Sequence, residues 1–326
     1  MENRDRMLTE IIKVLQYGDR IVIGVHTKPD ADSIGSMLAF ARALELYGHK
    51  HVVCGIEELP NSFKFLPGAD KLVYWSDLEP DLSPEIFIAL DCGSQSRLGH
   101  GERVFKRAEI TINIDHHLSN ELFGDINFVD VNAAACGEQV YEVLQRLNYP
   151  MDTEIVACLY AAIASDTGSF RFTNTTAASH RIAAELHEQG FDFPEMSQRL
   201  FDTRTPQEMQ LLAAILSTFE LYAEGQISVM TVTMDMLSRM QTDESETENY
   251  AGYARSITGS RVAILFKEQK DVVRVSFRSR DLTDVHALAA LFGGGGHKKA
   301  SGAVLMGNLH DVKAAVLAKT EAFLRG

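Results

Sequence analysis

Aspartate and histidine side chains gather at four places in the first 166 residues of the sequence, and three of these places directly follow a short apolar segment. In chain order the candidates are His26, Asp30, Asp32, Asp91, Asp115, His116, His117 and Asp166. A single aspartate after a strand is more often a helix cap or a turn former than a metal ligand. Repetition at successive strand ends changes this balance, because so many carboxylates together would repel one another without a cation. The sequence therefore predicts a metal centre.

Mixed carboxylate and imidazole ligands without cysteine suit manganese, zinc or iron better than calcium or magnesium. The candidates outnumber the ligands of a single ion, so we expect two ions that share a carboxylate. Two metal ions about 3.5–4 Å apart can clamp a phosphoryl group and activate water near neutral pH. The chemistry expected of these residues is therefore hydrolysis of a phosphate ester.

The elements that must position these residues alternate between short apolar runs and helical patterns. Strands are predicted at residues 21–25, 51–55, 71–75, 86–90 and 111–114, and helices at 31–48, 136–147, 154–165 and 176–189. This alternation predicts an α/β fold with a doubly wound, mainly parallel sheet. Ligands of such sheets bind beyond the carboxyl ends of the strands, so the candidate ligands should converge on one edge.

A second, smaller α/β domain is predicted in the remainder of the chain. The periodic pattern is lost over residues 191–205, which we interpret as a linker between a catalytic metal-binding domain at 1–190 and a second domain at 206–326. The elements predicted there are strands at 227–233, 261–268, 272–279 and 303–306, an acidic turn or helix start at 241–250, and helices from 206, at 281–292 and up to 325.

Composition restricts the class of partner. The net charge is 31 − 45 = −14, and an acidic protein is a poor non-specific binder of long duplex nucleic acid, so a short anionic ligand is favoured. The four cysteines form no CxxC pair and are expected to be reduced thiols of a cytoplasmic protein. No apolar run approaches the ~18–20 residues of a membrane span, so we expect no membrane partner.

The four motifs, in this order, resemble the DHH phosphoesterase superfamily, which is named for the triplet Asp115-His116-His117. The run Gly293–His297 with the two lysines after it resembles the glycine-rich segment of the DHH-associated substrate domain. The length and layout resemble the branch of bifunctional oligoribonucleases and pAp phosphatases. The resemblance implies a manganese-dependent hydrolase that degrades RNAs of a few nucleotides and converts 3′-phosphoadenosine 5′-phosphate (pAp) to AMP. It also implies a homodimer.

Carried over residue by residue, the resemblance assigns one ion to His26, Asp30 and Asp91. It assigns the second ion to Asp32, Asp91, His116 and Asp166, which makes Asp91 the bridge. Asp115 would orient a neighbouring imidazole. His117 would face the substrate, where it would stabilise charge on a phosphoryl oxygen or protonate the leaving group.

Substrate contacts are expected from both domains. Backbone N–H groups of a glycine-rich run can approach an anion, with basic side chains beside them. The residues assigned to substrate are Arg97, Arg278, Gly295, Gly296, His297, Lys298, Lys299 and Ser301. A solvated arginine at a strand end is the alternative for Arg278. Phe170 and Phe172 could stack on a base, although core packing is the more common role of phenylalanine.

Other activities stay open at this point. A RecJ-like single-strand DNA exonuclease usually carries a further nucleic-acid-binding domain, and a cyclic-dinucleotide phosphodiesterase often carries membrane segments; we expect neither here. Hydrolysis of linear dinucleotides such as pApA overlaps with the favoured activity. A non-catalytic nucleotide-binding regulator should have lost some metal ligands, whereas the whole set is present.

Overall fold

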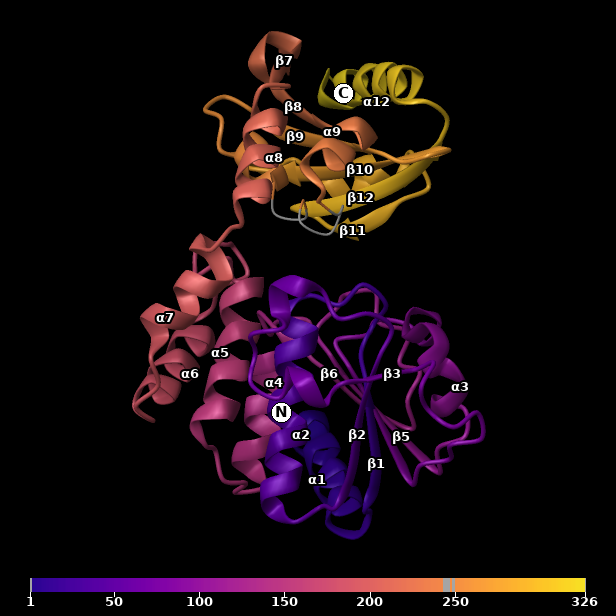
Figure 1. Ribbon diagram of the computed structural model, residues 1–326, viewed down its shortest axis with the longest axis vertical. Helices are drawn as coiled ribbons and strands as arrows, with labels where there is room; N and C mark the ends of the chain where they lie inside the picture. The colour runs from indigo at the N-terminus through magenta and orange to yellow at the C-terminus, as the bar shows by residue number, and fades with distance from the viewer. Residues whose placement is uncertain (1, 243–246, 248–249, 326) are drawn as a thin grey trace. The chain divides into compact units, whose positions relative to one another are not determined.

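The computed structural model describes residues 2–242, 247 and 250–325. The chain divides into two compact units, Met1–Thr203 and Arg204–Gly326, called here the first and second units (Figure 1). Among the described helices, none has both the length and the apolar character needed to cross a membrane.

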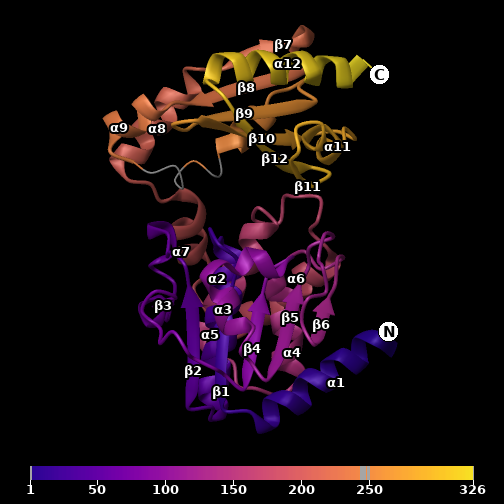
Figure 2. The same cartoon turned by 90° about the vertical axis from the view of Figure 1, so that its right-hand side faces the viewer.

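The first unit contains a six-stranded sheet in the order β3-β2-β1-β4-β5-β6, and every neighbouring pair is parallel. The strands are β1 (Arg20–Gly24), β2 (His51–Ile56), β3 (Val73–Tyr74), β4 (Ile86–Leu90), β5 (Ile110–Asp115) and β6 (Ile126–Val129). All five residues of β4 are buried, as expected for a parallel strand covered on both faces. The sheet confirms the predicted α/β fold. The chain adds β2 and β3 on one side of β1 and then β4, β5 and β6 on its other side, so the order of the strands changes direction between β1 and β4 (Figure 2).

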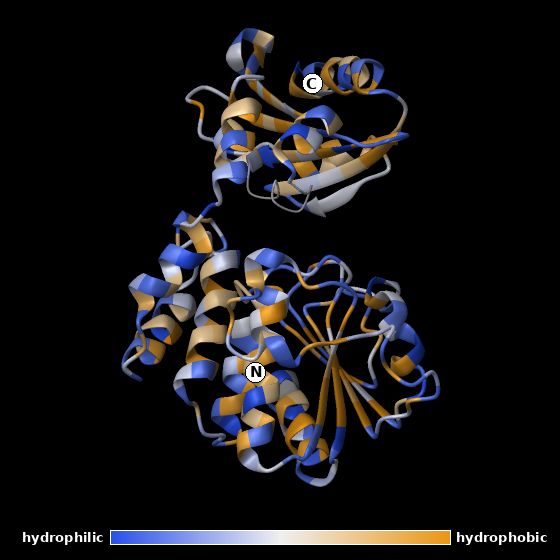
Figure 3. Ribbon diagram, viewed as in Figure 1, coloured by the Kyte–Doolittle hydropathy of each residue, from blue (hydrophilic) through white to orange (hydrophobic). Residues whose placement is uncertain are grey.

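Helices cover both faces of this sheet. They are α1 (Glu2–Tyr17), α2 (Ala31–Tyr47), α3 (Glu102–Phe105), α4 (Cys136–Arg146), α5 (Thr153–Asp166), α6 (Ala177–His187) and α7 (Phe193–Ser197), with short helical turns η1 (Asn61–Phe63), η2 (Ala69–Lys71), η3 (Gln95–Gly101) and η4 (Gln198–Asp202). Ile21 and Ile23 of β1 pack into the large core under α1, α2, α4 and α5, whereas Val22 between them joins a second core with Trp75 and Phe105. The apolar colouring of the strands in Figure 3 follows this two-sided burial.

The second unit contains a mixed six-stranded sheet in the order β11-β12-β10-β9-β8-β7, in which only β8 and β9 of the described strands are parallel neighbours. Its strands are β7 (Glu220–Tyr222), β8 (Ile227–Val232), β9 (Val262–Glu268), β10 (Val272–Ser279), β11 (Gly295–His297) and β12 (Ala300–Met306). Its helices are α8 (Pro206–Leu216), α9 (Met234–Met240), α10 (Ala251–Arg255), α11 (Val285–Ala290) and α12 (Leu309–Arg325), with the turn η5 (Ala223–Gly225).

The second unit differs from the prediction at several places, two of which lie in or beside the glycine-rich run. The helix expected from residue 281 begins only at Val285, because the Asp284 side chain accepts the backbone N–H groups of His286 and Ala287 and so caps it there. No strand was predicted in the glycine-rich run, but its last residues form β11, which pairs with β12. The acidic turn predicted at 241–250 falls mostly outside the described residues.

Candidate metal centre

His26 follows β1, and the first turn of α2 places Asp30 beside it. Nδ1 of His26 lies 2.8 Å from the carbonyl oxygen of Thr27, so the ring donates from Nδ1 and presents Nε2 to the carboxylates. Asp30 caps α2 by accepting the backbone N–H of Ser33 over 3.0 Å. Its Oδ2 lies 3.9 Å from His26 Nε2. Asp30 therefore lies within reach of an ion while it also caps the helix.

Asp91 directly follows β4, the strand that neighbours β1 at the point where the order of the strands changes direction. Its Oδ2 lies 3.5 Å from His26 Nε2, and its Oδ1 lies 3.3 Å from His116 Nε2. The side chain is 2% exposed, and among the described residues no hydrogen-bond donor satisfies Oδ1. A buried carboxylate oxygen without a donor is costly unless a cation compensates it. Asp91 thus joins the ligands after β1 to those after β5.

His116 is the centre of a second group. Its Nε2 lies 3.5 Å from Oδ2 of Asp166, at the end of α5, and 3.7 Å from Oδ2 of Asp32, in the first turn of α2. Its Nδ1 lies 3.3 Å from the carbonyl oxygen of Ala133, which again directs Nε2 toward the carboxylates. Asp166 is the more open member, because 28% of its side chain is exposed and that of Asp32 is fully buried.

His117 is held by Asp115, the last residue of β5. Nδ1 of His117 donates to Oδ1 of Asp115 over 2.7 Å, and Asp115 is fully buried. The same Nδ1 lies 3.5 Å from Oδ1 of Asp91, so His117 sits at the border of the cluster. Its side chain is 21% exposed, which leaves the ring accessible from solvent.

The electrostatics of the cluster reflect a shortage of positive charge. Burial alone would lower the pKa of His26, but hydrogen bonding to Asp91 and the charge of Asp30 raise that pKa to about 9. Burial likewise opposes protonation of His116, yet Asp91 raises its pKa well above the usual value. Burial and the charge of Asp91 raise the pKa of Asp32. Without metal, the histidines therefore hold protons where a divalent cation would supply charge.

The donor set fits divalent cations. Three groups of side chains each bring one ligand atom per residue within 4.8 Å of one another: His26 with Asp30 and Asp91, Asp32 with His116 and Asp166, and Asp91 with His116 and His117. The structure thus brings together all six residues that the sequence nominated as metal ligands. Their oxygen and imidazole donors are those preferred by manganese, zinc and iron.

The predicted substrate residues fall into two sets. Arg97, in η3, is exposed, and its carbonyl oxygen accepts the backbone N–H of Thr27 over 2.8 Å, which places it next to His26. The charge of Arg97 also lowers the pKa of His26. The aromatic candidates differ from each other: Phe170 packs against the large core, whereas Phe172 is 37% exposed.

The other predicted substrate residues lie together on β10, β11 and β12 of the second unit and in the turn between β11 and β12. They are Arg278, Gly295, Gly296, His297, Lys298, Lys299 and Ser301. Ser301 is buried, and its hydroxyl donates to the carbonyl oxygen of His297 over 2.7 Å, so it fixes the turn itself. His297 and Lys298 are exposed.

Several supporting residues escaped the sequence-based analysis. Asn113 and Asn120 form hydrogen bonds around Asp115, and Ser36 donates to Asp32 over 3.1 Å. Asparagine in a loop and serine in a helix are too common to mark a site by type or spacing. The only available signal was Asn113, a polar residue between Ile112 and Ile114 in a buried strand.

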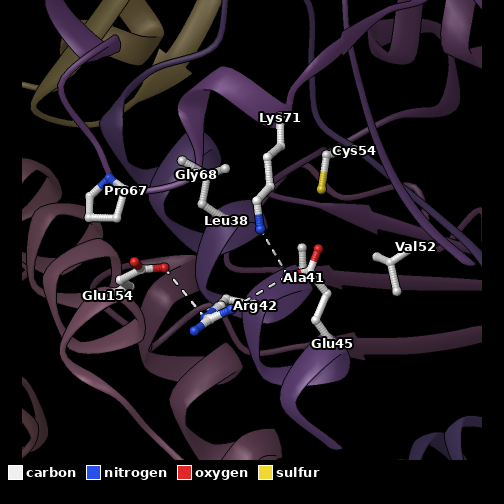
Figure 4. A pocket seen from close by; sticks show the side chains of 10 residues that line it. All are labelled: Leu38, Ala41, Arg42, Glu45, Val52, Cys54, Pro67, Gly68, Lys71 and Glu154. Atoms are coloured by element: carbon white, nitrogen blue, oxygen red, sulfur yellow. Dashed lines mark hydrogen bonds and ion pairs between the residues drawn. The ribbon is translucent and has the colours of Figure 1, made fainter. Parts of the chain in front are cut away.

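A separate pocket lies between α2 and β2 (Figure 4). Its charged groups are paired: Arg42 Nε lies 3.4 Å from Glu154, and Lys71 Nζ lies 3.1 Å from Glu45. Burial raises the pKa of the Cys54 thiol in this pocket to about 12, so the sulfur is protonated and unreactive. These balanced charges favour neither an anion site nor a nucleophile.

Comparison with known sequences agrees with this geometry. Residues 20–163 match the DHH family, N-terminal domain, and residues 226–326 match the DHHA1 domain. The chain is similar to the bifunctional oligoribonuclease and PAP phosphatase NrnA of Thermus thermophilus, with 33% identity over 93% of this chain and 88% of that protein. It is 30% identical to NrnA of Bacillus subtilis, over 91% of this chain and 93% of that protein.

Solved structures show the same fold. An exopolyphosphatase-related protein from Bacteroides fragilis superposes with a TM-score of 0.91 at 23% identity, over 99% of this chain and 98% of that chain. RecJ from Thermus thermophilus in complex with Mn²⁺ gives a TM-score of 0.55 at 15% identity, over all of this chain and 55% of that chain. With its two matched domains, its clustered aspartates and histidines and its full-length relatives, the chain belongs to the DHH family of phosphoesterases and is a hydrolase.

Proposed function

We propose that this protein is a manganese-dependent phosphoesterase that degrades very short RNA to mononucleotides and converts pAp to AMP. The observation that carries the proposal is the fully buried Asp91 carboxylate, which lies within 3.5 Å of His26 and of His116 and so links two groups of ligands. The similarity to NrnA proteins over nearly the whole length supports the choice of substrates.

Each side chain has a defined task in this proposal. His26, Asp30 and Asp91 would hold one ion, and Asp32, His116 and Asp166 would hold the second together with Asp91. Bound divalent cations would lower the pKa of water and neutralise charge on the phosphoryl group. Asp115 fixes the tautomer of His117 by accepting its Nδ1–H, which makes Nε2 the nitrogen that would act on a phosphoryl oxygen or on the leaving group.

Substrate selection is assigned to basic and glycine residues. Arg97 would contact a phosphate near the ions, since a guanidinium binds phosphate through two parallel hydrogen bonds. In the second unit, Arg278 and His297 would contact the remainder of the nucleotide, with Lys298 and Lys299 as further phosphate partners. The acidic protein then binds a short anion through a few local cations, which favours short substrates over long duplexes.

A kinetic panel tests the proposal. Purified protein with Mn²⁺ would be given pAp, RNAs of two to five nucleotides, single-stranded DNA, pApA and cyclic dinucleotides. We expect phosphate release from pAp and mononucleotides from the short RNAs, at rates well above those with DNA or cyclic dinucleotides. Activity on long DNA without activity on pAp or short RNA would reassign the protein to a RecJ-like exonuclease. Binding of pAp without any turnover would indicate a regulator.

A further inference from the structure

We propose that Asn120 is a positioning residue for hydrolysis: its amide holds the Asp115 carboxylate in the orientation that aligns His117. The inference rests on the proposed function, in which His117 acts on the substrate. It concerns a residue outside the metal cluster, because the side chain of Asn120 contacts none of the six candidate metal ligands among its described hydrogen bonds.

Each oxygen of the Asp115 carboxylate accepts a hydrogen bond from a different donor. Oδ1 accepts from Nδ1 of His117 over 2.7 Å, and Oδ2 accepts from Nδ2 of Asn120 over 2.5 Å. Asp115 is fully buried, so each oxygen needs a protein donor in place of water. Loss of the Asn120 donor would leave Oδ2 unsatisfied, and rotation of the carboxylate to recover a partner would misalign the His117 ring.

Asn113 fixes the orientation of the Asn120 amide. Its own Nδ2 donates to the carbonyl oxygens of Ala89 and Cys92 over 3.3 and 3.2 Å, at the end of β4. Oδ1 of Asn113 is thereby directed at Asn120, whose Nδ2 donates to it over 2.8 Å. This network explains why the buried part of β5 contains an asparagine.

The oxygen of the Asn120 amide is also used. It accepts the backbone N–H of Leu122 over 2.7 Å, while the backbone N–H of Asn120 donates to the carbonyl oxygen of His117 over 3.2 Å. The next residue ties the loop to β4, since the N–H of Glu121 donates to the carbonyl oxygen of Gly93 over 2.9 Å. Because Nδ2, Oδ1 and the backbone N–H of Asn120 are all bonded, a flip of the amide would lose these bonds and turn an oxygen toward Asp115, so the donor orientation is favoured.

The mechanistic consequence concerns the reacting nitrogen. With Asp115 held as the acceptor for Nδ1–H, His117 can carry its second proton only on Nε2, which is the nitrogen that would donate it to the leaving group. Supporting residues of this kind typically change activity by about 10–100-fold when removed. The ligands of the ions should be unaffected, so the change should appear in kcat and not in metal affinity.

The test compares Asn120→Leu, which removes the amide at similar volume, with Asn120→Gln, which keeps it, and with the exposed control Asn61→Leu. With full-length protein, Mn²⁺ and pAp, we expect Asn120→Leu to lower kcat about 10–100-fold, with KM and Mn²⁺ affinity within about twofold of wild type. Asn120→Gln should recover part of kcat, and Asn61→Leu should be unchanged. Unchanged kcat in Asn120→Leu, or equal losses of kcat and Mn²⁺ affinity, would overturn the proposal.

A spectroscopic measurement separates this inference from the proposed function. ¹⁵N-histidine NMR, with the His117→Gln variant used to assign the signal, should show one Nδ1-protonated tautomer of His117 in wild type and mixed tautomers in Asn120→Leu. This result is expected whether or not pAp is a substrate. An identical His117 spectrum in both proteins would overturn the positioning role even if the enzyme hydrolyses pAp.

Discussion

The backbone N–H of Cys136 donates to Oδ2 of Asp32 over 2.7 Å, so the first turn of α4 forms a hydrogen bond with a residue of the metal cluster. Oδ1 of the same carboxylate accepts the N–H of Gly137 over 3.0 Å and the hydroxyl of Ser36 over 3.1 Å. The positive end of the α4 dipole adds to this attraction. Asp32 is therefore both a candidate ligand and a structural tie between α2 and α4.

This double role predicts different effects of two similar substitutions. Asp32→Asn and Asp166→Asn should both abolish most activity, but only Asp32→Asn should destabilise the metal-free protein. An amide would turn its NH₂ group toward one of the α4 N–H donors, at a cost of about 1–3 kcal/mol, whereas no hydrogen bond to the Asp166 carboxylate is described. Calorimetry in EDTA should show a melting temperature lowered by about 2–8 °C for Asp32→Asn only. Equal melting temperatures would contradict the structural role of Asp32.

Substitution of the bridging residue should affect both ions. Asp91→Asn keeps the shape of the side chain but removes the charge shared by His26 and His116, so we expect the rate with pAp to fall by about three orders of magnitude, equivalent to roughly 4 kcal/mol. Titration should show Mn²⁺ binding weakened at both sites. The matched control is Asp70→Asn, an exposed aspartate of η2, which should leave rate and binding unchanged. Retained tight binding of two ions would contradict the bridging assignment.

The raised pKa of His26 gives the metal-free protein a defined pH dependence. Its pKa is about 9 in the folded state against a usual value of 6.5, so its contribution to stability is complete below about pH 6.5 and is lost as the pH rises through 9. We expect the free energy of unfolding in EDTA to fall by about 2–3 kcal/mol over this window. His26→Gln should flatten the curve. A slope of opposite sign would show that the imidazole is neutral in the folded protein.

Metal binding should follow the opposite trend. A cation displaces the protons held by His26 and His116, so Mn²⁺ affinity should increase between pH 6.5 and 9, with release of protons. Calorimetric titrations in buffers of different ionisation enthalpy measure this release. Proton uptake on binding, or no exchange, would contradict the protonated state of these histidines.

A change in the turn between β11 and β12 should alter the affinity for substrate without altering the affinity for metal. Gly296 has φ +136°, and a Cβ there would lie 2.7 Å from the carbonyl oxygen of Ala300, so Gly296→Ala must distort the turn. We expect KM for pAp to rise about tenfold, since such backbone strain costs about 1–3 kcal/mol, with Mn²⁺ affinity unchanged. Gly293→Ala serves as the control, because it also replaces a left-handed glycine but meets no atom within 4 Å. An unaltered KM in Gly296→Ala would remove this turn from the substrate site.

The sequence predicted the first sheet because its central strands are short, apolar and β-branched, and because helical patterns follow the first strand and the last predicted one. β6 was missed, since it lies at the sheet edge and alternates buried and half-buried residues, including Asn127. The three residues of β7, Glu220–Tyr222, were too few to give a period. Edge strands form because they pair with a neighbouring strand, so their own composition does not predict them.

The candidate metal residues could be anticipated because strand ends meet at one edge of a parallel sheet. The residues that orient them could not. Asn120 reaches Asp115 only through the path of the loop between them, and Cys136 contributes a backbone N–H that no side-chain pattern reveals. Substrate preference is harder still, because a few exposed cations describe the charge of a ligand and not its identity.

The unsatisfied oxygen of Asp91 gives the first unit a dependence on its surroundings. A folded protein that binds a cation, and an unfolded chain that does not, differ in free energy by an amount that grows with the logarithm of free ion concentration. Depletion of the ion would therefore enlarge the unfolded fraction of the protein, which is the form that proteases degrade. Supply of a trace metal would then govern how long each molecule survives, as well as how fast it works.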